Sequence, residues 1–242
     1  MREINISEII AVVKQLCIEA NLYINQDVVA KIEEAMEEEP SEAARGILEL
    51  ILKNHKMAAD EKMPLCQDTG VTIVFIEIGQ EVHIVGGDLK AAINEAVRQG
   101  YQDAYLRKSI VDDPVIERKN TQDNTPAIIY SEIVPGEKLK ITVTTKGGGA
   151  ENMSEVRMMK PADGMQGVID FVVDRIVKSG GNPCPPVIAG VGIGGSFEQS
   201  ALLAKKALLR PLDKNNPDPR YAAAEKDILR KINKTGVGPQ GL

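Results

Sequence analysis

The sequence of 242 residues predicts an α+β fold, with a mixed and mainly antiparallel sheet wrapped by many helices. Three observations support this fold class. Apolar side chains recur at helical spacing over the first sixty residues, residues 71–78 are β-branched and almost continuously apolar, and helical patterns return after residue 163. The length fits one large domain or two small ones, and we expect a single domain over residues 1–242.

The N-terminal third is expected to consist of helices. Ile6 to Ala20 carry the apolar stripe of the first helix, and two further helical patterns follow, the second of them after the break at Pro40-Ser41. Cys17 lies on the stripe of the first helix. We therefore expect it to be a small core residue rather than a ligand or a nucleophile.

Strands are expected near residues 71–85, 126–145 and 187–192. The apolar run of residues 71–78 predicts a strand buried on both faces, and residues 81–85 look like a short partner strand. The two strands within 126–145 are joined by Pro135-Gly136, which predicts a hairpin.

Two polar segments are candidates for a functional site. Residues 106–126 form a long polar loop, and a loop of this length in a compact domain tends to be functional, although a solvated connector is the alternative. Residues 146–152, Lys-Gly-Gly-Gly-Ala-Glu-Asn, expose backbone N–H groups that suit a carboxylate or a phosphate, or they form only a tight turn.

Composition excludes several classes of partner. Aromatic residues are 3% of the chain, tryptophan is absent and the net charge is −6, so we expect no nucleic-acid partner. No run approaches the roughly 18 apolar residues of a membrane span, and the N-terminus has no apolar signal core, so a cytoplasmic location is expected. Three cysteines in a chain of this length predict no disulfide framework, and favour metal binding or catalysis for a functional cysteine.

Gly190, Gly192 and Gly195 match the spacing of a dinucleotide-binding loop. The match is weak, because no second parallel strand with a ribose-binding acid follows. The start of the helix near Ser196 remains a candidate for contacting an anion or a cluster.

Cys66 and Cys184 both lie in loops stiffened by proline, with glycine nearby. Taken alone, Cys66 fits a nucleophile, a zinc ligand or a core thiol. The chain has no closely spaced cysteine pair, and neither His55 nor His83 lies in a loop that resembles a site. Isolated cysteines from separate loops suit a cluster that leaves one iron without a protein ligand, and such an iron can act as a Lewis acid.

Five ordered segments resemble those of the class I fumarases, the oxygen-sensitive iron–sulfur hydro-lyases to which L(+)-tartrate dehydratase is related. They are Pro64-Leu-Cys-Gln-Asp-Thr-Gly70, Arg118-Lys-Asn-Thr-Gln-Asp-Asn-Thr-Pro126, Lys146-Gly-Gly-Gly-Ala-Glu-Asn152, Cys184-Pro-Pro-Val and Gly236-Val-Gly-Pro-Gln-Gly241. The length resembles the α subunit of the two-subunit form, which is equivalent to the N-terminal domain of the fused form. The run from Lys119 to Pro126 looks more like fumarases than tartrate dehydratases.

The resemblance implies a [4Fe–4S] cluster with Cys66 and Cys184 as two of its three thiolate ligands. The third cysteine of the family lies beyond the equivalent of Leu242 and is absent from this chain. Because the chain stops inside the glycine-rich loop of residues 236–242, we expect it to be cut off inside a C-terminal motif. Gln67, Asp68, Arg107 and Gly149 are implied at the substrate, with Gln67 and Asp68 as the catalytic residues.

The implied activity is the reversible hydration of fumarate to malate, with dehydration of L(+)-tartrate as the alternative. The proton-transferring residues of the family lie in a partner β subunit, so a heteromer is implied, as a dimer or an α2β2 assembly. A non-catalytic module that binds anions through its glycine loops is the alternative from a different class.

Overall fold

The computed structural model describes residues 1–242 and divides them into two compact units. The first unit comprises Met1–Ile24 and Asn54–Gly148, and the second comprises Asn25–Lys53 and Gly149–Leu242. Helix α3 (Glu42–Glu61) contributes residues to both units. None of the helices combines the length and the apolar character needed to cross a membrane.

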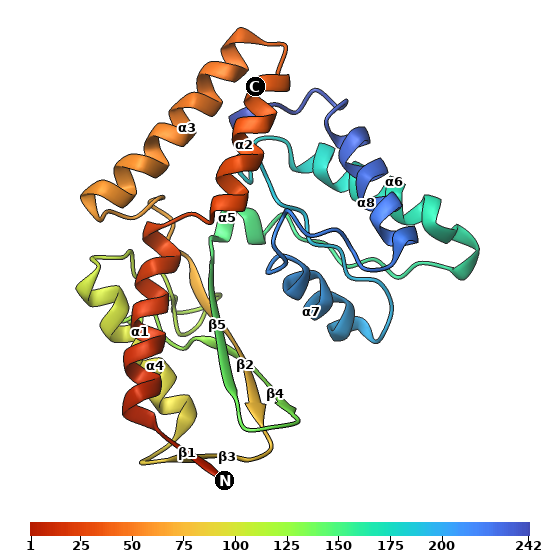
Figure 1. The fold of residues 1–242 in the computed structure, drawn as a ribbon. Helices are drawn as coiled ribbons and strands as arrows, with labels where there is room; N and C mark the ends of the chain where they lie inside the picture. The colour runs from red at the N-terminus through yellow and green to blue at the C-terminus, as the bar shows by residue number, and fades with distance from the viewer. The chain divides into compact units, whose positions relative to one another are not determined.

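The first unit contains two small sheets and two long helices (Figure 1). Its elements are β1 (Arg2–Asn5), α1 (Ile6–Leu22), β2 (Val71–Gly79), β3 (Val82–Val85), α4 (Leu89–Asp103), β4 (Ile128–Val134) and β5 (Leu139–Lys146). The larger sheet has the order β4-β2-β5, with β2 parallel to β4 and antiparallel to β5. The smaller sheet pairs β1 with β3 in parallel. The predicted α+β class and the mixed sheet are confirmed, although parallel pairing is more extensive than expected.

Helices α1 and α4 lie side by side in Figure 1 and form the core of the first unit with β2. Cys17 in α1 is completely buried in this core, as predicted. Gly100 allows α4 to approach α1 closely, because a Cβ atom there would lie 3.2 Å from the Cβ of Cys17. Burial raises the pKa of the Cys17 thiol to about 12, against the opposing effect of a hydrogen bond with Thr72.

Two strand pairings differ from those predicted. Strands β4 and β5 do not pair as a hairpin, because β2 lies between them. Residues 72–76 of β2 are all buried, so this strand takes the central position where both edges and both faces are covered. Strand β3 pairs with β1 rather than with β2, and β1 lies in the N-terminal third, where only helices are predicted.

The second unit is helical. Its elements are α2 (Gln26–Glu38), the first part of α3, the short helix α5 (Gly148–Glu151, of which Gly148 belongs to the first unit), α6 (Gly164–Ser179), α7 (Phe197–Ala207), α8 (Pro219–Ile232) and the 3-10 turns η1 (Pro161–Asp163) and η2 (Pro239–Gly241). Helices α6 and α8 pack against each other. The Asp27 carboxylate accepts a hydrogen bond from the Leu212 N–H at 2.6 Å and joins α2 to the segment after α7.

The predicted strand at residues 187–192 is wrong, since this segment is irregular. Its glycines pack against the backbone of α7. A Cβ atom at Gly190 would lie 2.2 Å from the Ala204 carbonyl oxygen, and one at Gly192 would lie 2.1 Å from the Ser200 carbonyl oxygen. Close packing on a helix therefore explains the glycine spacing that weakly resembled a dinucleotide-binding loop.

Candidate functional site

The loop that carries Cys66 follows α3 and is fixed at its entry by two hydrogen bonds. The Leu65 N–H donates to the Asn21 carbonyl at 2.9 Å, and the Asn54 side chain donates to the Leu65 carbonyl at 3.0 Å. Cys66 itself is exposed, whereas Thr69 and Gly70 at the end of the loop are buried. The loop therefore exposes the Cys66 thiol to solvent, while hydrogen bonds hold its beginning and burial holds its end.

The Cys66 thiol contacts the two residues that follow it. It donates to the Gln67 side-chain oxygen at 3.2 Å and accepts from the Asp68 N–H at 3.4 Å. Hydrogen bonds to sulfur stabilise a thiolate and tune the properties of metal clusters. Only the Asp68 N–H bond persists after deprotonation, because a thiolate has no proton to donate to Gln67.

Asp68 binds the glycine-rich turn at the end of β5. One of its carboxylate oxygens accepts from the Gly148 N–H at 2.8 Å, and a Cβ atom at Gly147 would lie 3.0 Å from the same oxygen. Gly70 approaches this turn even more closely, since a Cβ atom there would lie 2.2 Å from the Lys146 carbonyl oxygen. The Gly148 N–H therefore donates to an anionic group of the chain itself, the Asp68 carboxylate.

Arg107 comes from the beginning of the long polar loop and lies next to the Cys66 loop through its backbone. The Thr69 hydroxyl donates to the Arg107 carbonyl at 3.0 Å. The Arg107 side chain is exposed, and its guanidinium forms no hydrogen bond or ion pair within the chain. A free guanidinium can bind a carboxylate with two parallel charge-assisted bonds.

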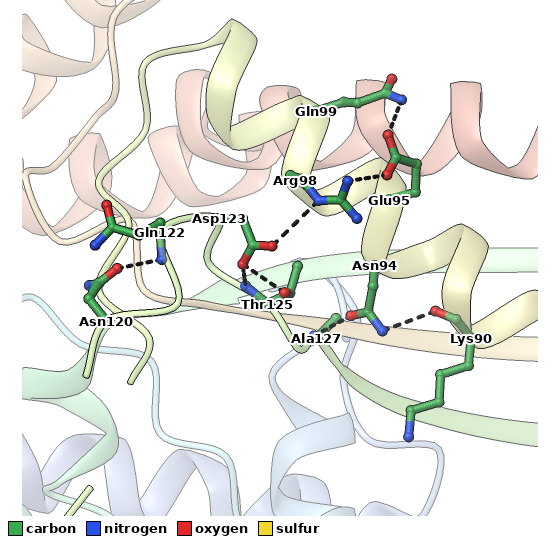
Figure 2. A network of polar contacts seen from close by, with 10 residues as sticks. All are labelled: Lys90, Asn94, Glu95, Arg98, Gln99, Asn120, Gln122, Asp123, Thr125 and Ala127. Carbon is green, nitrogen blue, oxygen red and sulfur yellow. Dashed lines mark hydrogen bonds and ion pairs between the residues drawn. The ribbon is translucent and has the colours of Figure 1, made fainter. Parts of the chain in front are cut away.

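The polar loop at residues 106–126 is irregular, as predicted, apart from an isolated bridge between Val111 and Asn120. Backbone hydrogen bonds close the loop on itself, from the Asp112 N–H to the Lys119 carbonyl and from the Thr121 N–H to the Ile110 carbonyl, and side chains bind it to α4. Arg98 of α4 lies 3.4 Å from the Asp123 carboxylate, and the Asn94 side-chain oxygen accepts from the Ala127 N–H at 2.8 Å; both contacts are drawn in Figure 2. Partial burial opposes ionisation of Asp123, yet hydrogen bonds from Thr125 hold its pKa below the usual range.

Two buried residues to which the sequence assigned no role of their own bind the end of the Cys66 loop, Asn124 from the polar loop and Tyr101 from α4. Asn124 is completely buried and hydrogen-bonds to Gly70, Ser109 and Ile110. Tyr101 of α4 is also completely buried, and its hydroxyl lies 2.9 Å from the Thr69 carbonyl and 3.0 Å from the Gly70 carbonyl. A tyrosine on the apolar stripe of a helix indicates only a core residue, and nothing local to Asn124 reveals its distant partners.

Cys184 lies in the second unit, in a loop held by the C-terminal residues. It is exposed and has a φ of 56°, in the left-handed region. The Gln240 N–H and side-chain amide both donate to the Pro185 carbonyl, at 2.8 and 3.1 Å. Gly149 belongs to the same unit and lies beside this loop, because a Cβ atom there would be 3.4 Å from the Asn182 carbonyl oxygen.

Two of the three cysteines are suited to ligate a metal cluster. Cys66 and Cys184 are exposed thiols in irregular loops, whereas Cys17 is sealed in the core. No group of three or more His, Cys, Asp or Glu side chains lies close enough together to hold a metal ion. The chain therefore supplies two accessible thiols, and a [4Fe–4S] cluster needs a further ligand besides these two.

A family model described as fumarate hydratase (Fumerase) matches residues 10–242. The chain is 39% identical over 235 residues to a protein of Methanocaldococcus jannaschii provisionally named L(+)-tartrate dehydratase subunit alpha, covering 96% of this chain and 82% of that protein. It is 34% identical over 218 residues to L(+)-tartrate dehydratase subunit alpha of Escherichia coli, covering 89% and 72% respectively. Through this match along nearly its whole length, the chain belongs to the fumarate hydratase (Fumerase) family.

Proposed function

We propose that the chain is the α subunit of a two-subunit iron–sulfur hydro-lyase that removes water from a four-carbon hydroxydicarboxylate. The observation that carries the proposal is the arrangement in the first unit. An exposed thiol at Cys66 is followed directly by an amide and a carboxylate, and the free guanidinium of Arg107 begins the neighbouring segment. Family membership and the α subunits among the relatives support the same assignment.

Cys66 and Cys184 are proposed as two thiolate ligands of a [4Fe–4S] cluster. When bound, such a cluster supplies an iron with an open position that acts as a Lewis acid toward the substrate hydroxyl group. The Asp68 N–H at 3.4 Å from the Cys66 sulfur then stabilises the ligated thiolate.

The substrate is proposed to contact Gln67, Asp68, Arg107 and Gly149. Arg107 binds one carboxylate of the substrate through its guanidinium, which no group of the chain occupies. Gln67 and Asp68 orient the hydroxyl group, since Asp68 has a second carboxylate oxygen besides the one bound to the Gly148 N–H. Gly149 allows close approach because it lacks a Cβ atom.

The reaction balances without a redox step. The C–O bond at the hydroxyl-bearing carbon breaks, a base takes a proton from the neighbouring carbon, and the C–H electron pair forms the new double bond. The hydroxyl group takes up a proton as it leaves and departs as water, and the base releases the proton that it took from carbon, so that the net products are the alkene and one water molecule. We propose that the base comes from a β subunit, consistent with relatives that are named as subunits alpha.

Two substrates fit this reaction. The sequence favoured fumarate and malate, but the named relatives are L(+)-tartrate dehydratase subunits, so L(+)-tartrate is the better supported candidate. The family description, fumarate hydratase, keeps malate as the second candidate. Dehydration of tartrate gives the enol of oxaloacetate, whereas dehydration of malate gives fumarate.

The substrate is identified by anaerobic kinetics on the chain co-expressed with its β subunit and reconstituted with iron and sulfide. We expect kcat/KM to be higher for L(+)-tartrate than for malate. The reverse order would identify a fumarate hydratase. An assembly that binds iron and dehydrates neither compound would contradict the proposed reaction.

The cluster is tested separately by its iron and sulfide content. We expect Cys66→Ser to lose bound iron and activity, and Cys17→Ser to retain both, because Cys17 is buried in the core. Full activity of Cys66→Ser would contradict the cluster assignment. A wild-type assembly that binds no iron would instead favour a non-catalytic anion-binding module.

A further inference from the structure

The strongest unassigned feature of the first unit is the buried side chain of Asn124. It is completely excluded from solvent although it lies in an irregular loop. Its side-chain oxygen accepts from the N–H groups of Ser109 at 2.8 Å and Ile110 at 3.3 Å, and its amide donates to the Gly70 carbonyl at 2.9 Å. One side chain thus joins the end of the Cys66 loop to the segment that begins with Arg107.

Neighbouring hydrogen bonds secure both of the segments that Asn124 joins. The Thr69 hydroxyl binds the Arg107 carbonyl at 3.0 Å, and the Asn120 side chain donates to the Lys108 carbonyl at 2.9 Å. The single O–H of Tyr101 lies between the carbonyls of Thr69 and Gly70, at 2.9 and 3.0 Å, so the Gly70 carbonyl that Asn124 binds also faces the phenol. In contrast, the Arg107 guanidinium is free, so only the backbone of its segment is fixed.

The backbone conformation of Asn124 agrees with this specific role. Its φ is 61°, in the left-handed region that asparagine and glycine adopt most readily. Burial of an amide is costly unless its polar atoms are paired, and here both the oxygen and the nitrogen are. The position therefore requires both a left-handed backbone and an amide that accepts and donates at once.

We propose that Asn124 is a positioning residue that sets the location of Arg107 relative to Gln67 and Asp68, and thereby the binding of the substrate carboxylate. This inference rests on the proposed function of the same site. Asn124 itself does not contact the substrate. It acts by holding the backbone at Ser109 and Ile110 against the carbonyl of Gly70.

The first test replaces Asn124 by glycine in the complete enzyme. Asn124→Gly keeps the left-handed backbone accessible and removes all three hydrogen bonds. We expect KM for the dicarboxylate to rise about tenfold, equivalent to about 1.4 kcal/mol of lost binding, with a smaller change in kcat. The matched control is Gln122→Gly, since Gln122 also has a positive φ of 68° but an exposed side chain, and its KM should stay unchanged.

The second test uses Asn124→Asp and the pH dependence of KM between pH 6 and pH 8.5. An ionised carboxylate still accepts from Ser109 but repels the Gly70 carbonyl, whereas a protonated carboxyl can donate to it. We expect KM of this variant to fall toward the wild-type value as the pH is lowered, which a simple loss of stability would not produce.

Two titratable neighbours, Tyr101 and Asp123, keep their protonation states between pH 6 and pH 8.5. Burial raises the pKa of Tyr101, although its hydrogen bond with Thr72 opposes the shift, so Tyr101 remains a neutral phenol. Asp123, whose pKa is lowered, remains ionised opposite Arg98. A change in KM that is confined to Asn124→Asp is therefore assigned to the new carboxyl group.

Hydrogen exchange provides a readout without catalysis. In the isolated chain, Asn124→Gly should speed amide exchange at Ser109 and Ile110, while Gln122→Gly should not. Unchanged exchange in Asn124→Gly would overturn the inference, and so would a KM that stays within twofold of wild type. A wild-type enzyme inactive on both dicarboxylates would overturn the proposed function instead, and the exchange rates would still decide whether Asn124 holds this segment.

Discussion

Cys17 is the only cysteine of the chain whose thiol is buried and therefore inaccessible to ligands and reactants. Because burial raises its pKa to about 12, the thiol stays protonated in the folded chain at a pH where the unfolded chain begins to ionise. A raised pKa contributes stability that is present below the unfolded value near 9 and is lost as the pH rises toward 12. The buried phenol of Tyr101 acts in the same direction.

We therefore expect the free energy of unfolding to fall above pH 9, with Cys17 contributing up to about 1.4 kcal/mol per pH unit. Urea unfolding at pH 8, 9 and 10 measures this slope. The variant Cys17→Ala should show a shallower slope, whatever its stability at pH 8. Equal slopes in the two proteins would show that the thiol is not the titrating group.

The side chain of Gln67 affects the charge beside the Cys66 sulfur. Its side-chain oxygen accepts from the Cys66 thiol, and its neutral amide can turn to donate to a thiolate. In Gln67→Glu a carboxylate would face the thiolate, and repulsion of about 1 kcal/mol between exposed charges weakens iron retention roughly fivefold. Iron content after dialysis against a chelator measures the effect.

The control for Gln67→Glu is the same change of charge at Gln122, whose side chain is exposed in the polar loop and forms no side-chain bond. Gln122→Glu should retain iron as the wild type does. If both variants lose iron equally, overall charge rather than the contact with Cys66 is responsible.

At the scale of elements, two helix N-termini offer a direct comparison. The Asn5 side chain caps α1 by accepting from the Ser7 N–H at 2.9 Å, whereas Asn25 precedes α2 without a side-chain hydrogen bond. We expect Asn5→Ala to reduce stability by about 1 kcal/mol, because a helix N–H loses its partner. Asn25→Ala should cost clearly less in the same urea unfolding experiment, and equal losses would show that the observed cap bond contributes little.

The packing of residues 190–192 on α7 predicts a second effect on stability. In Gly192→Ala the new Cβ atom would lie 2.1 Å from the Ser200 carbonyl oxygen, so the segment must move away from the helix. We expect a loss of at least about 2 kcal/mol.

Gly46 in α3 serves as the control in the same unit. A Cβ atom there meets nothing within 4 Å, so Gly46→Ala should be neutral or stabilise by up to about 1 kcal/mol through helix propensity. Thermal unfolding of both variants provides the comparison. A tolerated Gly192→Ala would contradict the tight contact between the segment and α7.

At the scale of the whole molecule, the two exposed cysteines belong to different units. If both thiols ligate one cluster, as proposed, the two single substitutions do not have additive effects on iron content. We expect Cys66→Ser, Cys184→Ser and the double variant to show the same low iron content in the assembled enzyme. Half-maximal iron in each single variant would indicate two separate sites.

Local features of the sequence sufficed for the long helices, for strand β2 and for the irregular loops of the candidate site. The apolar stripe of α1 placed Cys17 in the core, and the continuous apolar run of β2 identified a strand covered on both faces. The irregular loops with Cys66, Arg107 and Cys184 were also expected from proline, glycine and polar residues. These properties follow from side-chain periodicity and backbone preference, which act over a few neighbouring residues.

Only the tertiary structure decided how these pieces pair. The order β4-β2-β5, the pairing of β3 with β1, and the packing of Gly190 and Gly192 on α7 all depend on contacts between distant segments. The same holds for Asn124, whose partner Gly70 lies 54 residues away in the sequence. The sequence by itself therefore determined which helix and strand faces are buried and which loops carry reactive groups. The fold decided the partners of these residues, because periodicity is a local property whereas buried polar groups find their hydrogen-bond partners in distant segments.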